Sequence, residues 1–483
     1  MTNTAAIIGG GVIGGGWAAR FLMAGWDVRV FDPDPEAERK IGAVLTNARR
    51  TLPGLADVAL PAEGNLEFCP TIAAAVKDAN LIAEAVPERL KIKQNVYAEI
   101  EAANETGVIA SSTSGIMPTD LQANMRHPGR LIVAHPFNPV YLLPLVELVA
   151  GEKSDPATIE SAKELYRSLG MYPLHCRVEI AGFLSDRLQE ALWREALWLL
   201  KDKVATAEEL DAAIAYGPGL RWAQMGTMQT FHLAGGEGGM RAMLAMFGPC
   251  LKWPWTKLMD VPELTDDFVE MVGEQCDQQA GDLSPRDLEA IRDDNLVAIL
   301  RSLKAKRWGA GQSLRQYDQL LRSSDTIDLS QPIRTLDRVV PTDWTDYNGH
   351  MNEARYLEAF SEATDRFMQI IGCDAAYIAS GGSYFTAETH IRHLDEVRAG
   401  EPVHVDTQCL AGAGKKMHLF NSLYHRDGRL LATGEHMLIH VSLETRRAAP
   451  PADAIAQKLN TIAMLHELLP RPGGAGRAIA EVV

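Results

Sequence analysis

The sequence predicts an α/β domain with a parallel sheet, followed by an all-α domain and then an α+β domain. At 483 residues the chain is much longer than a single hydrophobic core requires. Short β-branched runs alternate with helical patterns up to about Lys201, longer helical patterns follow, and strand-type alternation returns after Pro332. Each change of pattern marks a new domain.

We place the domain boundaries where the pattern changes. They are 1–185 for the α/β domain, 186–322 for the helical domain, 323–331 for a linker, 332–450 for the α+β domain and 451–483 for a C-terminal tail. The linker is polar and lacks periodicity, and the tail is rich in Ala, Pro and Gly apart from one expected helix at 454–469.

The first strand, helix and strand of the α/β domain are the clearest elements. Ala5–Ile8 is predicted as a strand, Val12–Ala24 as a helix closed by Gly25, and Val28–Phe31 as the next strand. Later strands are expected at Leu81–Val86, Val108–Ala110, Leu131–Ala134 and Val146–Val149. These runs are apolar enough to be buried on both faces, as in a sheet covered by helices on both sides.

The second and third domains have different periodicities. Helices are expected at Leu188–Leu200, Ala207–Tyr216 and Pro285–Trp308, and strands at Val403–Cys409, His418–His425 and Glu435–Ser442 around a helix at Asn352–Ile371.

Composition excludes several classes of protein. No apolar run approaches the roughly 20 residues of a membrane helix, and the N-terminus lacks the basic region of a signal peptide. The six cysteines show no paired spacing, so neither disulfides nor a metal site are expected. A net charge of -16 disfavours nucleic acid and anionic membranes. We therefore expect a cytoplasmic protein.

A glycine-rich turn predicts a dinucleotide site. Gly9, Gly11 and Gly14 form G-x-G-x-x-G directly after a strand, and Val12 and Ile13 open the following helix. This backbone can turn tightly and approach a pyrophosphate at the helix N-terminus, as in a Rossmann domain.

Asp32 predicts which dinucleotide binds. It ends the second strand, where its carboxylate can accept hydrogen bonds from the ribose hydroxyls and repel a 2'-phosphate. The cofactor is therefore expected to be NAD. An FAD-binding variant and a Rossmann fold that has lost its nucleotide are the alternatives.

Three further segments carry a family resemblance. EAVPERLKIKQ, ASSTSG and AHPFNPVYLLPLVELV follow the glycine motif in an order that closely resembles the 3-hydroxyacyl-CoA dehydrogenase family, over about residues 5–320. GPGLRWAQMG and LAGGEGG resemble its short-substrate branch, which includes carnitine 3-dehydrogenase, gulonate dehydrogenase and lambda-crystallin. The resemblance implies NAD-dependent oxidation of a 3-hydroxy acid.

The resemblance also implies catalytic roles. His135 is similar to the general base, Glu147 to the carboxylate that orients it, Ser114 to a substrate-hydroxyl contact and Asn138 to a further site residue. The chemistry is sound on its own terms, because oxidising a secondary alcohol requires removal of the hydroxyl proton, and an imidazole paired to a carboxylate suits that task. On residue type alone, a structural histidine is the alternative.

Glu88 and Lys93 lie in the EAVPERLKIKQ segment. Glu88 matches a family position near the nicotinamide, and Lys93 is assigned with it to cofactor binding. For Glu88 the alternative is a solvated acid at the start of a helix.

One departure from the family concerns the substrate. The segment Gly182-Phe183-Leu184-Ser185-Asp186-Arg187 has Asp186 where the family usually has asparagine. An ionised carboxylate cannot donate a hydrogen bond, but it can attract a positively charged substrate. Arg187 or Arg221 could pair with a substrate carboxylate.

Aromatic side chains offer a partner for a quaternary ammonium group, because the ring face attracts a cation. Trp193, Trp222 and Phe231, with Trp198 and Tyr216 nearby, lie in the helical domain. Core packing is the alternative explanation. Together with the carnitine-type resemblance they imply L-carnitine as substrate.

The segment VPTDWTDYNGHMNEARYLEAF resembles the hotdog-fold thioesterases of the 4-hydroxybenzoyl-CoA type, over about residues 332–450. Asp346 matches the base or nucleophile, while Gly349, His350 and Asn352 lie where backbone donors could stabilise an oxyanion. A non-catalytic dimerisation module is the alternative.

The domain order resembles bacterial carnitine dehydrogenases that carry a betainyl-CoA thioesterase. It implies NAD-dependent oxidation of L-carnitine to 3-dehydrocarnitine, hydrolysis of an acyl-CoA thioester resembling betainyl-CoA, and a homodimer. The alternatives are a 3-hydroxyacyl-CoA or gulonate-type dehydrogenase with an unrelated hotdog domain, and a crystallin-like structural protein that retains its Rossmann site.

Overall fold

The computed structural model describes residues 3–223, 225–235, 237, 239–247, 281–322 and 327–477, together with isolated residues between 263 and 278. The chain forms two compact units. One comprises Met1–Ala48 and Pro61–Tyr317, and the other Arg49–Leu60 and Asp318–Val483. Among the described residues, no helix is both long and apolar enough to cross a lipid bilayer.

The first unit contains an eight-stranded sheet in the order β3-β2-β1-β4-β5-β6-β7-β8. Its strands are β1 (Thr4–Ile8), β2 (Asp27–Phe31), β3 (Leu66–Phe68), β4 (Leu81–Glu84), β5 (Val108–Ser111), β6 (Leu131–Pro136), β7 (Leu145–Ala150) and β8 (Tyr172–Cys176). Neighbouring strands run parallel except β6 and β7, which are antiparallel. The order reverses between β1 and β4, where a Rossmann fold binds its ligand.

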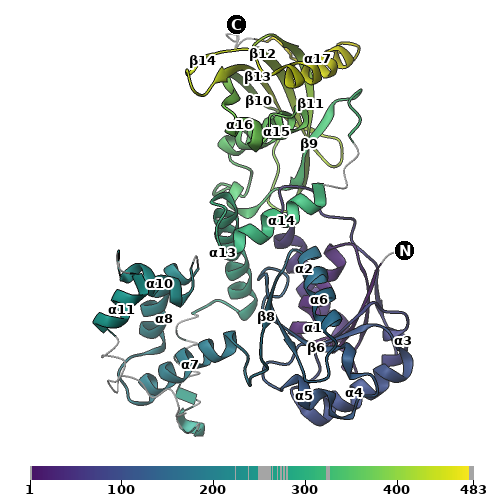
Figure 1. Cartoon of the computed structure of the whole chain (residues 1–483), viewed down its shortest axis with the longest axis vertical. Helices are drawn as coiled ribbons and strands as arrows, with labels where there is room; N and C mark the ends of the chain where they lie inside the picture. The colour runs from purple at the N-terminus through teal and green to yellow at the C-terminus, as the bar shows by residue number, and fades with distance from the viewer. Residues whose placement is uncertain are drawn as a thin grey trace. The chain divides into compact units, whose positions relative to one another are not determined.

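Helices cover both faces of this sheet (Figure 1). They are α1 (Val12–Met23), α2 (Ala37–Thr51), α3 (Ile72–Val76), α4 (Leu90–Ala103), α5 (Pro118–Leu121) and α6 (Pro156–Ser168), with 3-10 turns at Gln122–Asn124 and Pro128–Arg130. A further 3-10 turn at Leu52–Leu55 follows α2 and belongs to the other unit. Side chains of α3, α4 and α5 share one buried cluster with the sheet, while Trp17 of α1 packs on Tyr166 of α6. The predicted Rossmann fold is confirmed.

The same unit continues as helices. They are α7 (Ser185–Lys201), α8 (Ala207–Ala215), α9 (Pro218–Trp222), α10 (Thr227–Ala234), α11 (Gly239–Phe247), α13 (Pro285–Ala305) and α14 (Ala310–Arg322). Two of these helices, α8 and α13, begin with a capping box, which Thr206 and Ser284 each form with the acid three residues later. Four residues of the expected linker, 323–326, and two glycines of LAGGEGG lie outside the described residues.

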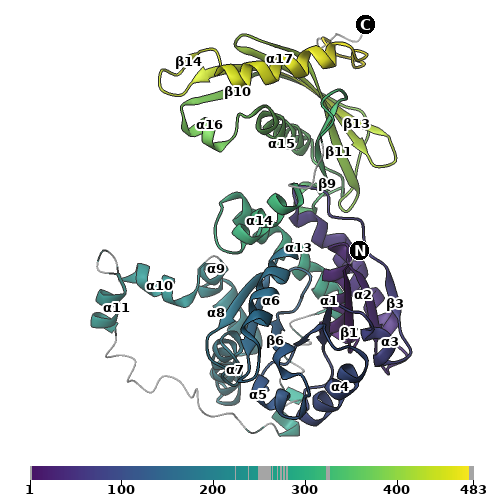
Figure 2. The same ribbon diagram turned by 45° about the vertical axis from the view of Figure 1, so that its right-hand side comes forward.

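The C-terminal unit is a curled antiparallel sheet in the order β10-β13-β12-β11-β9. Its elements are β9 (Ile333–Val339), α15 (Glu353–Ile371), α16 (Ala375–Ala379), β10 (Gly382–His393), β11 (Pro402–Ala413), β12 (Lys416–His425), β13 (Leu430–Ser442), β14 (Arg447–Ala448) and α17 (Asp453–Glu467), with a 3-10 turn at Thr342–Trp344. The long helix α15 packs on the sheet, and α17 lies along β11 (Figure 2). This is the predicted hotdog fold, and α17 is the helix expected in the tail.

A buried histidine in β13 is expected to make the C-terminal unit sensitive to acid. His436 is 3% exposed, its Nδ1 lies 3.0 Å from Oγ1 of Thr389, and burial lowers its pKa to about 4. The unfolded chain takes up this proton near pH 6.5, so the free energy of unfolding is highest above that pH and falls towards pH 4. The loss between pH 7 and pH 5 should be roughly 2 kcal/mol.

Denaturant unfolding at the two pH values measures this loss. In a His436→Gln variant the difference between pH 7 and pH 5 should shrink by that amount, while His390→Gln on β10 should leave it unchanged. An equal pH dependence in the wild type and His436→Gln would contradict this assignment.

Candidate active site

The glycine turn after β1 forms a cradle open on one side. Gly9 has φ +107°, and a Cβ there would lie 2.5 Å from the carbonyl oxygen of Ala85; a Cβ on Gly14 would lie 1.8 Å from the carbonyl oxygen of Gly9. A Cβ on Gly11, in contrast, would meet no atom within 4 Å. Gly9 and Gly14 are thus required for packing, while the space over Gly11 is open.

The start of α1 suits an anion in that space. Gly11 is the N-cap of this helix and provides no side-chain cap, and the first turn carries no acidic residue. The backbone amides of the first turn, from Val12 and Ile13 onward, therefore have no partner within the helix. Unpaired amides and the helix dipole together favour a phosphate group. The residues present therefore fit the pyrophosphate of NAD.

Asp32 follows β2 and holds the same turn. Its Oδ2 accepts a hydrogen bond from the amide of Gly10 at 2.5 Å, and its Oδ1 accepts one from the amide of Asp34 at 2.7 Å. Each carboxylate oxygen has a second lone pair, which leaves acceptor capacity for ribose hydroxyls.

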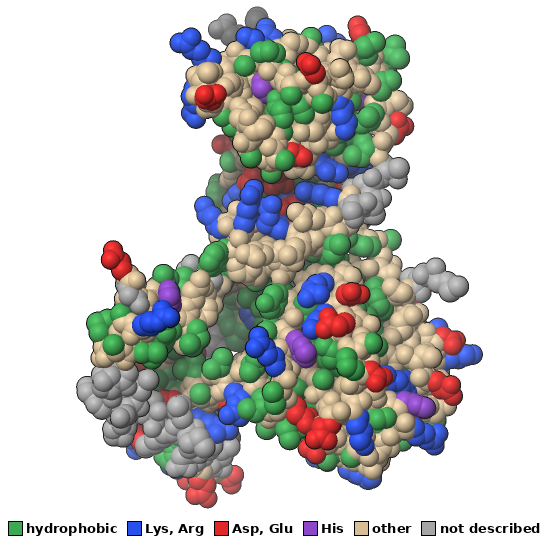
Figure 3. Space-filling view, in the orientation of Figure 1, with side chains coloured by type: hydrophobic (Ala, Val, Ile, Leu, Met, Phe, Trp, Pro, Cys, Tyr) green, Lys and Arg blue, Asp and Glu red, His purple; other side chains and the backbone are tan. Residues whose placement is uncertain are grey.

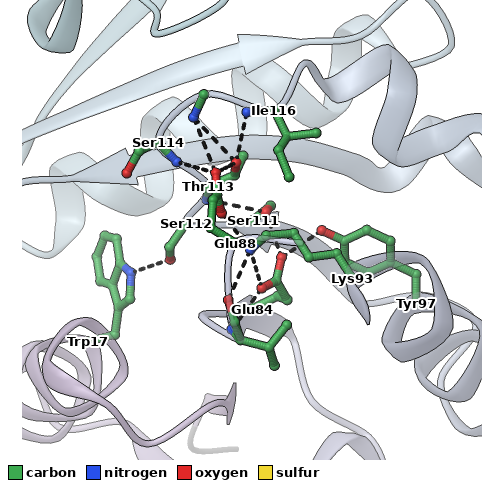
Figure 4. Close-up of polar contacts among 12 residues, drawn as sticks. Trp17, Glu84, Glu88, Lys93, Tyr97, Ser111, Ser112, Thr113, Ser114 and Ile116 are labelled. Atoms are coloured by element: carbon green, nitrogen blue, oxygen red, sulfur yellow. Dashed lines mark hydrogen bonds and ion pairs between the residues drawn. The ribbon is translucent and has the colours of Figure 1, made fainter. Parts of the chain in front are cut away.

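Glu88 lies in the loop between β4 and α4, and Lys93 lies in the first turn of α4 (Figure 4). Glu88 accepts hydrogen bonds from the hydroxyl of Thr113 and from the amides of Ser114 and Gly115, the latter two at 3.1 and 3.3 Å. Burial alone would raise the pKa of Glu88, but these bonds and Lys93 bring it below its usual value. Lys93 is 1% exposed, and its ammonium group faces only acceptors of the protein. We expect it to affect the cofactor through Glu88 rather than by direct contact.

The antiparallel pairing of β6 with β7 places His135 directly opposite Glu147. The Nδ1 atom of His135 lies 3.0 Å from Oε2 of Glu147, and the two side chains are 5% and 0% exposed. Phe137 and Phe183 flank the imidazole, with ring centroids 4.9 and 5.6 Å away. The ring is thus held between aromatic groups with its Nε2 edge directed away from Glu147.

Glu147 also accepts hydrogen bonds from the backbone at the start of α7. Its Oε1 accepts hydrogen bonds from the amides of Leu184 and Ser185 at 3.1 and 3.0 Å, where α7 begins. Burial tends to raise the pKa of Glu147, but the bonds from His135 and from these amides outweigh burial and lower it. An ionised carboxylate only accepts hydrogen bonds, so Nδ1 of His135 carries the proton and Nε2 presents its lone pair.

Asp186 is in the first turn of α7, next to the open edge of the imidazole. Its Oδ2 lies 3.6 Å from Nε2 of His135, and its side chain is 23% exposed. Burial raises the pKa of Asp186, an effect that His135 opposes and Glu147 reinforces. The histidine is therefore flanked by one fully buried carboxylate and one that reaches solvent.

Other residues expected near the substrate are exposed. Ser114 and Asn138 follow β5 and β6 and have accessible side chains, and the guanidinium of Arg187 donates to the carbonyl oxygen of Ala181 at 3.2 Å. Trp193, Trp222 and Phe231 are 59%, 41% and 45% exposed. In the part of the chain that the structure describes, these three aromatic side chains do not form a closed cage.

In the C-terminal unit, Asp346 lies in a short loop ahead of α15. Its Oδ1 accepts a hydrogen bond from the amide of Asn348 at 2.8 Å, and its own amide donates to the carbonyl oxygen of His350 at 2.9 Å. Asn352 caps α15 by accepting from the amide of Ala354 at 3.0 Å. The carboxylate therefore stands at the N-terminal end of the central helix.

Two backbone amides of this loop already donate hydrogen bonds within the loop. The amide of Gly349 donates to the carbonyl oxygen of Asp346 at 3.0 Å, and that of Asn352 to Trp344 at 2.9 Å. Both amides are used to close the loop, and the expectation that Gly349, His350 and Asn352 stabilise an oxyanion stays a prediction.

Two features next to the predicted site residues were not predicted from the sequence. The amides of Leu184 and Ser185 have no side-chain signal, although Gly182 and Phe183 before them, both at positive φ, form a turn. Glu84, buried at the end of β4, could have been found, because a charged residue inside an apolar strand requires a partner.

Family models match three parts of the chain. The NAD binding domain of 3-hydroxyacyl-CoA dehydrogenase matches residues 4–179, its C-terminal domain matches 182–262, and the thioesterase-like superfamily matches 340–459.

Relatives match over the full length. An L-carnitine dehydrogenase/betainyl-CoA thioesterase from Ruegeria pomeroyi is 59% identical over 483 residues and covers 99% of each chain. A protein of the same name from Rhizobium meliloti is 49% identical, covering 99% of this chain and 98% of the relative. The chain belongs to the L-carnitine dehydrogenase/betainyl-CoA thioesterase family.

Two further matches each cover about two thirds of the chain. An L-carnitine dehydrogenase from Mesorhizobium japonicum is 58% identical over 327 residues, covering 66% of this chain and 90% of the relative. A solved NAD-dependent dismutase, 5-formyl-3-hydroxy-2-methylpyridine 4-carboxylic acid 5-dehydrogenase, matches with a TM-score of 0.54 and 31% identity, covering 63% of this chain and 99% of its own. Membership confirms an NAD-dependent oxidoreductase fused to a thioesterase-like domain, whereas the roles of individual residues stay predictions.

Proposed function

We propose that this chain oxidises L-carnitine to 3-dehydrocarnitine with NAD, and that its hotdog domain hydrolyses a betainyl-CoA-like thioester. Full-length relatives carrying both activities in their names support the pair of reactions. The single structural observation that favours a cationic substrate is the Asp186 carboxylate, 3.6 Å from the open nitrogen of His135.

His135 would accept the proton of the substrate hydroxyl at Nε2, while Glu147 keeps the proton on Nδ1 and stabilises the imidazolium that forms. Ser114 would donate to the same hydroxyl oxygen. NAD, when bound over the glycine turn, supplies the acceptor for the hydride from the carbinol carbon. The phenyl rings of Phe137 and Phe183 beside the imidazole keep water from its faces.

Asp186 supplies the charge that an acyl-CoA substrate does not need. The trimethylammonium group of carnitine is one carbon from the carbinol carbon, so a hydroxyl on Nε2 of His135 brings the cation close to Asp186. An asparagine at this position can donate to a thioester carbonyl, whereas an ionised aspartate cannot. Aspartate in place of the usual family asparagine at position 186 is therefore consistent with a substrate that carries a cation instead of a thioester.

The remaining substrate contacts are proposed from residue type. Arg187, at the start of α7, would pair with the substrate carboxylate. Trp193, Trp222 and Phe231 would contact the trimethylammonium group if the helical domain closes over the substrate.

NADH formation followed by absorbance tests the substrate. L-carnitine should be turned over, while D-carnitine and 3-hydroxybutyryl-CoA should be poor substrates. Asp186→Asn restores the usual family residue, so it should fold; it should lower kcat/KM for L-carnitine roughly tenfold to hundredfold and lower it less for an uncharged 3-hydroxy acid. Activity with the CoA ester alone, or equal losses for charged and uncharged substrates, would contradict the role of Asp186.

The C-terminal domain is proposed to act as a thioesterase through Asp346. Its carboxylate would activate water or attack the thioester carbonyl, with the N-terminal end of α15 nearby. Release of free CoA thiol from betainyl-CoA measures this reaction directly.

We also propose that the protein is a cytoplasmic homodimer that binds neither nucleic acid nor membranes. Large apolar side chains are exposed on α7 to α11, including Leu188, Tyr216 and Met228, at 70%, 86% and 72%. Figure 3 shows hydrophobic side chains at the surface of this helical part of the molecule. An apolar surface of this kind is unusual for a monomer. Light scattering should give twice the 52.8 kDa chain mass, and a mass of one chain would exclude the dimer.

A further inference from the structure

A buried carboxylate lies beneath the turns that follow β4 and β5. Glu84, the last residue of β4, is 0% exposed. Its Oε1 accepts from the amide of Val86 at 2.8 Å and from the ammonium group of Lys93 at 2.7 Å. Its Oε2 accepts from the hydroxyls of Tyr97 and Ser111, each at 2.6 Å. Four donors from three elements thus meet at one side chain (Figure 4).

Lys93 connects the buried carboxylate of Glu84 to Glu88, which is partly exposed. Besides Glu84, its ammonium group contacts the carbonyl oxygen of Val86 and Oε2 of Glu88, both at 3.2 Å. An ammonium group has three N–H donors, and three acceptors surround this one. Lys93 is therefore fully engaged between an interior carboxylate and one at the rim.

Glu88 completes the connection. Its Oε1 faces Thr113, Ser114 and Gly115, and Thr113 in turn accepts from the amide of Ile116 at 3.0 Å. The turn carrying Ser114, the proposed substrate contact, is thus bonded to Glu88, and Glu88 to Lys93. A continuous chain of polar contacts joins Glu84 to the backbone of Ser114.

The charges explain why this chain should be rigid. Glu84 and Lys93 are almost fully buried, and removing one member of such a pair leaves the other without its counter-charge. A buried network in which each member is satisfied holds one geometry, while a partly satisfied one does not. A change at Glu84 should thus alter the position of Glu88 and Ser114, although Glu84 itself touches neither.

We propose that Glu84 is a positioning residue of the dehydrogenase site, acting through Lys93 and Glu88 on the turn that carries Ser114. The inference rests on the proposed dehydrogenase function. It differs from a purely structural role, in which loss of Glu84 would lower stability and leave catalysis by the folded enzyme unchanged.

Glu84→Gln in the full chain tests this role, because it keeps the shape and removes the charge. We expect kcat for L-carnitine to fall about tenfold or more, since small displacements of positioning groups are costly. Binding of ADP-ribose, which lacks the nicotinamide and is expected over the glycine turn, should change less than about twofold. The number of ADP-ribose sites per chain reports the amount of folded dehydrogenase domain.

Glu101→Gln is the matched control. Glu101 on α4 is also buried, at 6% exposure, but it accepts only from the amides of Arg126 and His127, at 3.0 and 2.7 Å. This variant should lower the melting temperature without changing kcat. If Glu84→Gln behaves in the same way, with kcat unaltered below its melting temperature, the inference is wrong.

Two milder variants test the same role if Glu84→Gln does not fold. Tyr97→Phe and Ser111→Ala each remove one donor to Oε2 of Glu84, and each should lower kcat severalfold; normal kcat in both would overturn the inference. In addition, Glu84→Gln and Lys93→Met should not be additive in kcat, because they interrupt the same connection. Wild-type enzyme inactive on carnitine would instead refute the proposed function, independently of these variants.

Discussion

Replacing His135 with alanine is expected to lower NADH production from L-carnitine by about a thousandfold or more, because the substrate hydroxyl loses its proton acceptor. Asp186 lies near the same space, but its carboxylate is a weaker base than imidazole at neutral pH. NAD affinity, measured by titration of tryptophan fluorescence, should stay nearly constant, because the glycine turn contains no contact to His135.

His127→Ala provides the control, since this histidine is exposed in a turn of the same domain. It should keep wild-type activity. NADH production that survives in His135→Ala would show that another group accepts the proton, with Asp186 the first residue to examine.

Asp346→Asn is expected to reduce thioester hydrolysis roughly a hundredfold to ten-thousandfold, in line with the loss of a general base or nucleophile. Asparagine can still accept the hydrogen bond that Asn348 donates to Oδ1, so the loop before α15 should keep its shape. Dehydrogenase activity should be unaffected, and it serves as the measure of folded protein.

The neighbouring Asp343→Asn tests whether position matters. Its side chain is exposed in the turn just before Trp344, so hydrolysis should remain near the wild-type rate. Unaltered hydrolysis by Asp346→Asn would remove that residue from the mechanism and favour a non-catalytic hotdog module.

Much of the fold was predictable from periodicity. The strands from Ala5 to Val149 are continuous apolar runs, and such runs indicate burial on both faces of a sheet. An apolar run does not indicate whether a strand is parallel or antiparallel to its neighbour, so the antiparallel β7 was not predicted. The short β3 and the half-buried β8 were missed, because three residues or a run interrupted by Pro173 carry little periodic signal.

The contacts among the predicted site residues could not be predicted from the sequence. Resemblance named His135 and Glu147, while their contact depends on the register of β6 with β7. It also named Lys93 as a cofactor contact, yet burial directs that side chain inward. Exposure of Trp193 and Trp222 was likewise beyond the sequence, because helical spacing does not reveal what covers a helix.

The hydrogen bonds from the amides of Leu184 and Ser185 to Glu147 determine where a chimera of two related enzymes can be joined. The glycine turn and Asp32 lie within the first 32 residues, but the carboxylate of Glu147 is held by the backbone of Leu184 and Ser185, where α7 begins. Exchanging the helices from α7 onward between relatives would therefore replace part of the proposed His135–Glu147 pair as well as the proposed substrate contacts. A chimera joined after α7 preserves that pair, whereas one joined at Cys176 rebuilds it from foreign backbone.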